Sequence, residues 1–398
     1  MSTRRAAIIV LDGLGIGPAP DTAQYGDAGS DTLGNAARAV GGLKLPNLEK
    51  LGLGLCRTGP GAAIAGLSRD VSPSAAHGVA QPASPGKDST TGHWEICGVL
   101  LDKPFRTYPH GFPPALLEEF ARRTGRGWLG NTVSSGTEII EKLGRRHQRT
   151  GHWIVYTSAD SVFQIAAHEG TVPLDELYGA CAVAREMLMG QHAVSRVIAR
   201  PFEGEPGDYR RTAHRKDFSI APVGRTLLDG LAERGVPRIG IGKVDDLFAG
   251  RNIESEHTPT NADAYRLIEQ AWDTLDTGFV FVNVIEFDQT WGHRNDVPGF
   301  HQGLVELDQW IPRLLSRLRR DDLVMFTADH GNDPTTPSTD HSREMVPVLV
   351  LGPSVKPVAL GTRRTFADLG QTVAEFFGVE RLAAGTSFLG DVWWGSAR

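Results

Sequence analysis

The chain has 398 residues, a formal net charge of −6 and 40% hydrophobic residues, a composition typical of a folded globular protein. Its length exceeds what one hydrophobic core usually organises, so we expect two domains. No run of Lys and Arg is long enough for a nucleic-acid-binding surface, and no apolar stretch reaches the roughly 18 residues of a membrane span. We therefore expect neither nucleic acid nor a membrane as a partner.

Cysteine usage favours a reducing, cytoplasmic compartment. Cys56, Cys97 and Cys181 are odd in number, far apart and outside any C-x-x-C pattern. The N-terminal apolar run, residues 6–11, is interrupted by Asp12 and is shorter than the apolar region of a typical signal peptide. We interpret this run as a buried strand.

Three short apolar runs have the pattern of buried parallel strands, namely residues 6–11, 279–285 and 323–328. Helical patterns flank them, for example at 304–318. Each run is followed within a few residues by acidic residues or histidines. Because ligands bind beyond the carboxyl ends of the strands in open α/β sheets, the sequence predicts one site assembled from these distant segments.

The middle of the chain is predicted to be an insertion. It contains strand-like segments at 153–159 and 195–202 and a helix-like segment at 174–188, but it lacks the strand-end pattern of Asp and His. The core pattern resumes at 237–247. The expected domains are a core formed by residues 1–101 and 222–398 and a smaller cap formed by residues 102–221.

The residues that follow the three strands suit a metal centre. They are Asp12 after the first run, Asp288 and His293 after the second, and Asp329, His330 and His341 after the third. Mixed carboxylate and imidazole ligands suit Zn²⁺ or Mn²⁺. Six ligands are too many for one tetrahedral ion but fit two ions bridged by a further oxygen, an arrangement suited to in-line phosphoryl transfer. The alternatives are surface loops whose Asp and His residues serve turns.

Two glycine-containing segments need separate interpretation. Gly13, Gly15 and Gly17 lack the G-x-G-x-x-G spacing of a dinucleotide loop, so we expect them to let the backbone approach the metal centre. The stretch GKDSTTGHW, residues 86–94, is not a P-loop, because Gln81 occupies the place of the first glycine. Its three successive hydroxyls, at 89–91, are candidates for the missing bridging oxygen, and the pattern alone does not choose among them.

Seven motifs together resemble the phosphopentomutase family of the alkaline phosphatase superfamily. They cover most of the chain in the family's order: DGLGIGPAPD at the N-terminus, GSDTLGN (29–35), GKDSTTGHWEICG (86–98), YTSADSVFQIAAHE (156–169), RVIARPF (196–202), GHR (292–294) and DHGNDP with TDHSREMVPV (329–348). The resemblance implies a three-layer α/β/α alkaline-phosphatase-like core with an inserted smaller α/β cap. It also implies interconversion of ribose 1-phosphate, or its 2-deoxy form, with the 5-phosphate.

The resemblance assigns roles to residues of this chain. One metal would be held by Asp12, Asp329 and His330, and the second by Asp288, His293 and His341. The two ions would be Mn²⁺, although other divalent metals are possible, and a sugar bisphosphate would activate the enzyme. The substrate would be a small sugar phosphate, and a monomer is favoured.

The nucleophile implied by the family pattern is Ser89, which would carry the phosphate. Family members usually have threonine there, so a two-metal phosphohydrolase remains an alternative on the same fold. A mutase for another sugar phosphate, which differences in the cap would permit, is a second alternative. A metal-binding interaction protein without catalysis is the alternative from another class. Thr90 and Thr91 are then expected to cap or line the helix that begins at this point. The substrate-binding residues implied are Ser158, Asp160, Arg196, Ile198, Arg211 and Lys243.

Overall fold

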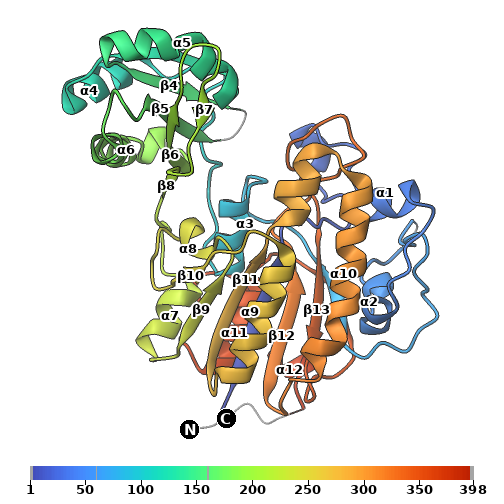
Figure 1. Cartoon of the computed structure of the whole chain (residues 1–398). Coiled ribbons are helices and arrows are strands. Elements are labelled where there is room, and N and C mark those ends of the chain that lie inside the picture. The colour runs from blue at the N-terminus through green and yellow to red at the C-terminus, as the bar shows by residue number, and fades with distance from the viewer. Residues whose placement is uncertain (1–2, 60, 159–160, 395–398) are drawn as a thin grey trace. The chain divides into compact units, whose positions relative to one another are not determined.

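The computed structural model describes residues 3–59, 61–158 and 161–394. The chain divides into two compact units (Figure 1). The first unit is Met1–Lys103 with Pro222–Arg398, and the second is Pro104–Ala221. The sequence analysis places the corresponding boundaries at residues 102 and 221. Within the described ranges, no helix is long and apolar enough to cross a membrane.

An eight-stranded sheet forms the centre of the first unit, in the order β10-β9-β11-β1-β12-β13-β2-β14. Its strands are β1 (Arg5–Leu11), β2 (Ala76–Ala80), β9 (Arg238–Ile241), β10 (Ser255–Glu256), β11 (Gly278–Val284), β12 (Asp322–Thr327), β13 (Val346–Leu351) and β14 (Ala359–Arg363). Strand β1 pairs in parallel with both β11 and β12. The three predicted parallel strands are therefore confirmed, and their carboxyl ends share one edge of the sheet.

The sheet is mixed, because β13 runs antiparallel to both β12 and β2. Strand β14 returns to a parallel pairing with β2. The sequence analysis does not predict β2, whose sequence AHGVA contains neither an apolar run nor alternating apolar and polar residues. This strand is defined by its pairing with β13 and β14 rather than by its own residues.

Helices cover the sheet on both faces, which gives the three-layer α/β/α core that the resemblance implies. The helices of the first unit are α1 (Thr32–Ala39), α2 (Pro46–Leu51), α3 (Ser89–Ile96), α7 (Leu227–Glu233), α8 (Val244–Leu247), α9 (Asn261–Thr274), α10 (Val297–Leu315), α11 (Ala367–Phe377) and α12 (Leu389–Val392). Figure 1 shows α9 and α10 lying across one face of the sheet. Helix α9 packs on β11 and α10, whereas α11 packs against α3 and α7. Every residue of β1, β11 and β12 is buried, as expected for strands covered on both faces.

Helix α10 differs from the helix predicted at 304–318. It begins at Val297 and ends at Leu315. The Asp296 side chain caps it by accepting a hydrogen bond from the N–H of Gly299, and Pro298 lies in the first turn, where the missing N–H costs nothing. The predicted start is late because these capping signals precede the apolar stripe.

A buried ion pair joins β1 to β12 at the amino ends of both strands. The Arg5 guanidinium donates to both carboxylate oxygens of Asp322, at 2.9 and 2.5 Å, and also to the backbone carbonyl of Trp272. Both side chains are 1% exposed. Because an unpaired charge here would be costly, the pair favours the observed register, in which Arg5 and Asp322 are opposite each other.

The second unit is an α/β domain with a six-stranded sheet, β3-β4-β5-β6-β7, in which β8 also pairs with β6. Its elements are β3 (Trp128–Val133), β4 (Trp153–Thr157), β5 (Val162–His168), β6 (Arg196–Glu203), β7 (Arg210–Arg211), β8 (Lys216–Ser219), α4 (Pro114–Thr124), α5 (Gly136–Thr150) and α6 (Leu174–Met187). One apolar cluster joins α4 and α6 to the sheet, and a separate cluster joins α5 to it. The strands predicted at 153–159 and 195–202 and the helix predicted at 174–188 are confirmed as β4, β6 and α6, although residue 159 lies outside the described residues.

Candidate active site

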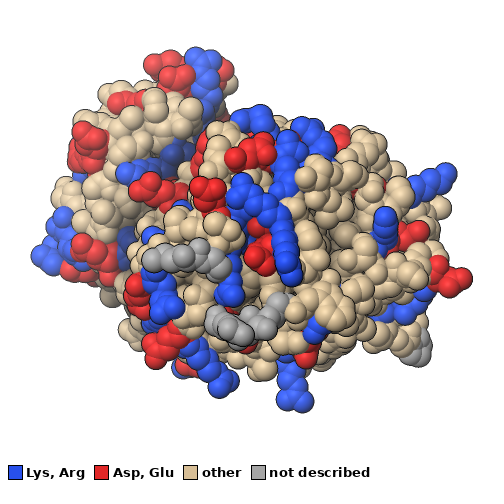
Figure 2. Space-filling model, turned by 90° about the horizontal axis from the view of Figure 1, so that it is seen from below, with Lys and Arg blue, Asp and Glu red and all other residues tan. Residues whose placement is uncertain are grey.

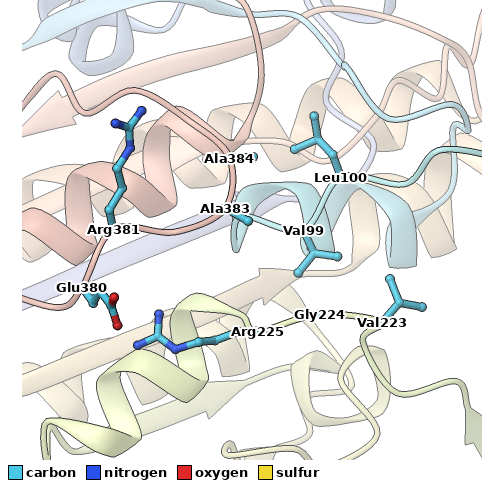
Figure 3. A pocket seen from close by; sticks show the side chains of 10 residues that line it. Val99, Leu100, Val223, Gly224, Arg225, Glu380, Arg381, Ala383 and Ala384 are labelled. Carbon is cyan, nitrogen blue, oxygen red and sulfur yellow. The ribbon is translucent and has the colours of Figure 1, made fainter.

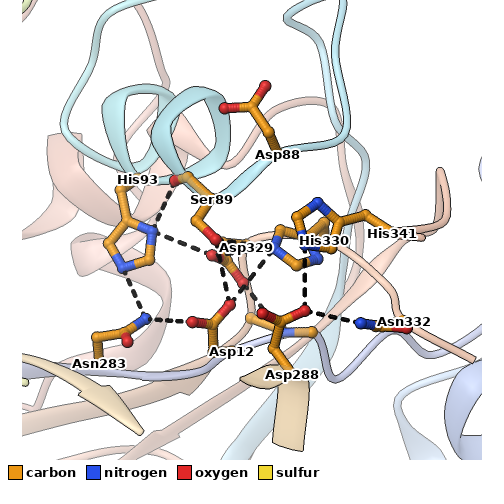
Figure 4. A network of polar contacts seen from close by, with 12 residues as sticks. Asp12, Asp88, Ser89, His93, Asn283, Asp288, Asp329, His330, Asn332 and His341 are labelled. Atoms are coloured by element: carbon orange, nitrogen blue, oxygen red, sulfur yellow. Dashed lines mark hydrogen bonds and ion pairs between the residues drawn. The ribbon is translucent and has the colours of Figure 1, made fainter. Parts of the chain in front are cut away.

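Polar side chains converge where the parallel strands of the first unit end (Figure 4). Asp12 directly follows β1, and its N–H extends the ladder by donating to the carbonyl of Val284. Asp288 lies in the π-helical turn η4 (Phe287–Trp291) that follows β11. Asp329 and His330 follow β12 after one intervening residue. The predicted convergence of these segments is thus present in the fold.

The converging side chains form two overlapping groups whose ligand atoms lie within 4.8 Å of one another. One group is Asp12, Asp329 and His330, and the other is Asp288, His330 and His341. The family resemblance assigns His293 to the second metal, whereas the second group contains His330 instead. His293 is nevertheless adjacent, with its Nε2 atom 3.3 Å from Asp288 Oδ2.

The chemistry of these donors fits divalent metal ions. Asp329 Oδ2 and His341 Nε2 are buried yet make no hydrogen bond within the described residues. Both do lie within ion-pair distance of other members of the cluster: His341 Nε2 is 3.2 Å from Asp288 Oδ1, and Asp329 Oδ2 is 3.1 Å from His93 Nδ1. Proximity alone does not satisfy either atom, because a buried polar atom without correct bonding geometry is costly unless a further partner satisfies it. A metal ion is such a partner.

Backbone carbonyls orient two of the histidines. The Nδ1 atom of His293 lies 2.6 Å from the carbonyl oxygen of Thr339, and that of His330 lies 3.1 Å from the carbonyl oxygen of Gly331. A carbonyl only accepts, so each ring carries a proton on Nδ1 and presents Nε2 to the cluster. This is the usual arrangement of a metal-binding histidine.

The metal-free cluster has strongly shifted pKa values. Burial would lower the pKa of His330, but the neighbouring carboxylates of Asp329 and Asp12 outweigh burial and raise the pKa to about 10. Burial would also lower the pKa of His293, but the Asp288 carboxylate outweighs burial and raises this pKa to about 9. The pKa of Asp12 is lowered despite burial, chiefly by the ammonium group of Lys243. Protons therefore occupy positions that metal ions would otherwise take.

Ser89 lies at the first position of α3 and faces the first metal-ligand group. Its Oγ atom is 3.1 Å from His330 Nε2 and 3.4 Å from Asp12 Oδ1. The helix N-terminus favours negative charge at this position, as a phosphate would bring. Among the three candidate hydroxyls, Ser89 makes these contacts with the cluster.

Of the two roles expected for Thr90 and Thr91, capping α3 or lining it, the structure shows the second, because both lie in its first turn. Neither Thr90 nor Thr91 caps the helix, because the Asp88 carboxylate does so by accepting from the N–H of Thr91 at 3.0 Å. The Thr91 hydroxyl donates to the other oxygen of Asp88 at 2.6 Å. A carboxylate is a better acceptor than a hydroxyl for the free N–H groups of a first turn.

Two glycines allow backbone to approach the cluster closely, as predicted for the N-terminal segment. Gly13 has a φ of +79°, and its N–H donates to Asp329 Oδ1 at 3.1 Å. A Cβ atom on Gly92 would lie 2.3 Å from the carbonyl oxygen of Asp329, so α3 can pack here only with glycine at that position. Helix α3 and the segment that carries Asp329 are thus in direct contact.

Arg343 is a residue that the sequence analysis missed. Its side chain is 3% exposed and donates to the carbonyl oxygens of Ser84 and Gly86, both at 2.6 Å. It also pairs with Asp21 at 3.0 Å. Arg343 therefore ties the loop before Ser89 to the segment that carries His341. The sequence signal that could have identified Arg343 is its position inside the TDHSRE motif.

The predicted substrate residues are distributed over both units. Lys243 lies in the first unit, with Nζ 2.7 Å from Asp12 Oδ2. In the second unit Ser158 follows β4, Arg196 begins β6, Arg211 lies in β7, and Ile198 is buried with 2% of its surface exposed. Asp160 lies outside the described residues.

Two further arginines of the second unit were also missed. Arg200 lies on β6 and Arg215 directly precedes β8. Arg215 donates to both oxygens of Asp217, at 2.7 Å, and Arg196 approaches the same carboxylate at 3.5 Å. Burial lowers the pKa of the Arg200 guanidinium, and the nearby Arg215 lowers it further. Positive charge is therefore concentrated around Asp217 in this unit.

A pocket of about 620 Å³ in the first unit is separate from the cluster. It is lined by the segments 98–100 and 223–225 together with Glu380, Arg381, Ala383 and Ala384 (Figure 3). None of these residues is a predicted site residue. On the face shown in Figure 2, basic and acidic side chains are interspersed.

Fold and site together define a metalloenzyme of the alkaline phosphatase superfamily. Consistent with this, a family model described as Metalloenzyme superfamily matches residues 4–381. A phosphopentomutase from Anaeromyxobacter sp. strain K is 56% identical over 391 residues, covering 98% of this chain and 99% of that protein. A phosphopentomutase from Carboxydothermus hydrogenoformans is 53% identical over 392 residues, covering 98% and 99%. The chain therefore belongs to the phosphopentomutase family, which is a family of isomerases.

Proposed function

We propose that the chain interconverts (2-deoxy)ribose 1-phosphate and (2-deoxy)ribose 5-phosphate through a phosphorylated Ser89. The observation that carries the proposal is the position of Ser89 Oγ, at a helix N-terminus and 3.1 Å from His330 Nε2 in the candidate metal cluster. Family membership supports the reaction, because the relatives named above are phosphopentomutases.

Two divalent metal ions, preferably Mn²⁺, would complete the site. Asp12, Asp329 and His330 would hold one ion, and Asp288, His293 and His341 the other. When bound, such ions lower the pKa of a coordinated hydroxyl and neutralise charge on the phosphoryl oxygens. The remaining catalytic work is positioning and electrostatic stabilisation by the chain itself.

The proposed cycle begins with phosphate on Ser89. The free hydroxyl of a bound pentose phosphate attacks this phosphorus, the bond to Ser89 Oγ breaks, and a pentose 1,5-bisphosphate forms. After the sugar reorients, Ser89 Oγ takes the phosphoryl group from the other end. A sugar bisphosphate would be needed to phosphorylate resting Ser89.

Cap arginines would hold the sugar phosphate. Arg196 and Arg211 can bind a phosphate through paired N–H groups, as guanidinium geometry allows. Ser158, Asp160, Ile198 and Lys243 complete the proposed substrate set. We further propose a cytoplasmic, monomeric protein without nucleic-acid or membrane partners, a compartment in keeping with three free, buried cysteines.

The test is to incubate purified protein and Mn²⁺ with ribose 5-phosphate, with and without a sugar bisphosphate, and to assay ribose 1-phosphate and free phosphate together. Isomerisation that depends on the bisphosphate supports the mutase. The second candidate is a phosphohydrolase, favoured by serine at position 89, where threonine is usual in the family. Phosphate release that matches or exceeds isomerisation would favour the hydrolase.

A further inference from the structure

His93 is a buried histidine of the nucleophile helix to which the proposed mechanism gives no role. It lies one helical turn after Ser89 on α3, and none of its surface is exposed. Its ring packs 5.6 Å from the ring of Phe281 on β11. Figure 4 shows the ring between Ser89, Asp329 and Asn283. It therefore contacts three parts of the site at once.

The neighbours of the His93 ring fix its hydrogen-bonding pattern. The Nδ1 atom is 2.9 Å from the carbonyl oxygen of Ser89 and 3.1 Å from Asp329 Oδ2. Both neighbours are acceptors, so Nδ1 carries the proton. The Nε2 atom, 3.2 Å from Asn283 Nδ2, is then free to accept.

The orientation of Asn283 follows from Asp12. Asn283 Nδ2 lies 3.2 Å from Asp12 Oδ2, and a carboxylate accepts hydrogen bonds only, so the amide nitrogen and not the amide oxygen must face it. An amide nitrogen has two N–H bonds. One serves Asp12, and the other serves His93 Nε2.

We propose that His93 and Asn283 are a pair of positioning residues that fix the two carboxylates of the first metal site. Hydrogen bonds run from Asp12 through Asn283 and His93 to the backbone carbonyl of Ser89, and His93 Nδ1 also lies 3.1 Å from Asp329 Oδ2. The pair thereby sets the orientation of both carboxylates relative to the nucleophile. This inference rests on the proposed metal sites, and it assigns no ligand role to either residue.

The second unit provides a matched control, His147. It too is fully buried, with Nδ1 2.6 Å from the carbonyl of His152 and Nε2 accepting from the N–H of His168 at 2.9 Å. Its hydrogen-bonding pattern is that of His93, but its partners are backbone groups away from the candidate ligands. His147→Ala should therefore lower the melting temperature of the metal-free protein and leave metal binding unchanged.

The experiment is a Mn²⁺ titration of metal-free full-length protein, with free Mn²⁺ followed by electron paramagnetic resonance. We expect two sites in the wild type, and in His93→Ala one site weakened about 10- to 100-fold with the other unchanged, as for loss of other residues that orient metal ligands. Asn283→Ala should weaken the same site. The double variant should be no weaker than the weaker single variant, because both act through one set of bonds.

His93→Asn separates positioning from packing. Its amide nitrogen lies near the position of Nδ1 and keeps the approach to Asp329, but the bond to Asn283 is lost, so this variant should recover affinity to the level of Asn283→Ala. If His93→Ala does not fold, His93→Asn and Asn283→Ala together provide the test. Wild-type affinity in His93→Ala, or an equal loss in His147→Ala, would overturn the inference. Absence of Mn²⁺ binding by the wild type would overturn the proposed metal sites as well.

Discussion

Lys243 forms an ion pair with Asp12, with Nζ 2.7 Å from Asp12 Oδ2, while the other oxygen of this carboxylate faces Ser89 and His330. A cation thus lies beside a carboxylate that is proposed to bind a metal ion. Burial would lower the pKa of Lys243, but the surrounding carboxylates, Asp12 foremost, raise it. The ammonium is therefore a permanent positive charge at the site.

Replacing Lys243 with Met should separate substrate binding from metal binding. The variant loses a cation that an anionic sugar phosphate can contact, so we expect KM for ribose 5-phosphate to rise about tenfold. A tenfold change corresponds to a binding free energy of roughly 1.4 kcal/mol. Mn²⁺ affinity should not fall, because removing a nearby positive charge does not disfavour a cation. Steady-state kinetics and Mn²⁺ titration measure the two effects. Weaker Mn²⁺ binding with an unchanged KM would instead show that Lys243 orients Asp12.

Replacing Ser89 with Ala should reduce isomerisation at least 10³-fold while Mn²⁺ binding is retained, because the phosphate acceptor is lost but the six proposed ligands remain. Thr90→Ala should keep most activity. Transfer of ³²P from labelled bisphosphate to the protein, measured beside the kinetics, locates the phosphorylated residue. Activity in Ser89→Ala together with its loss in Thr90→Ala would show that the nucleophile was wrongly assigned.

Replacing Ser89 with Thr tests why serine occupies this position. A phosphothreonine is more shielded from water than a phosphoserine, so we expect a lower ratio of phosphate release to isomerisation in the variant. The ratio is measured in one assay mixture with ribose 5-phosphate and bisphosphate. An unchanged ratio would mean that water is excluded by other residues.

The pH dependence of stability should reverse when metal is added. The folded-state pKa values of His330 and His293, about 10 and about 9, exceed the ordinary value of about 6.5. Their contribution to the stability of metal-free protein is therefore fully present below about pH 6.5 and is lost as pH rises to 9 and then 10. Metal binding needs these rings deprotonated, so Mn²⁺ affinity should rise over the same range.

Melting temperatures of metal-free and Mn²⁺-saturated protein between pH 6 and 10 check this reversal. The gap between the two curves should widen with pH. Parallel curves would contradict the assignment of these histidines to the metal site.

Removing one partner of the buried Arg5–Asp322 pair should be strongly destabilising. We expect Asp322→Ala to lower the free energy of unfolding by about 3–5 kcal/mol, because it leaves the buried guanidinium without a counter-charge. The control is Asp276→Ala, which removes an exposed pair with Arg319 at 3.5 Å and should cost at most about 1 kcal/mol. Chemical denaturation of the metal-free protein measures the free energy of unfolding of both variants. Equal losses would contradict the larger cost expected for breaking the buried pair.

The convergence of the candidate metal ligands could be predicted because they follow strands whose apolar character is visible in the sequence. Parallel strands bring their carboxyl ends to one edge, so Asp12, Asp288 and Asp329 could be placed together without coordinates. His93, Asn283 and Arg343 could not be found this way. Their roles depend on which atoms lie opposite them, and that is decided by tertiary packing rather than by local pattern.

Elements whose form depends on their neighbours were also missed. Strand β2 has no apolar run, and the antiparallel direction of β13 is set by pairing across the sheet. The sequence leaves open whether Thr90 and Thr91 cap or line α3, and Asp88, one residue before the three hydroxyls, provides the cap.

The central position of β1 has a consequence for how the chain is made. Although β1 leaves the ribosome first, both strands that pair with it, β11 and β12, begin only at Gly278 and Asp322. The first sheet therefore cannot close until most of the chain has been synthesised. The second unit contains all of its own strands within one continuous segment, so it can fold earlier. During synthesis, the apolar strand β1 therefore stays unpaired while the second unit is already folded. Chaperones would be most needed at this stage.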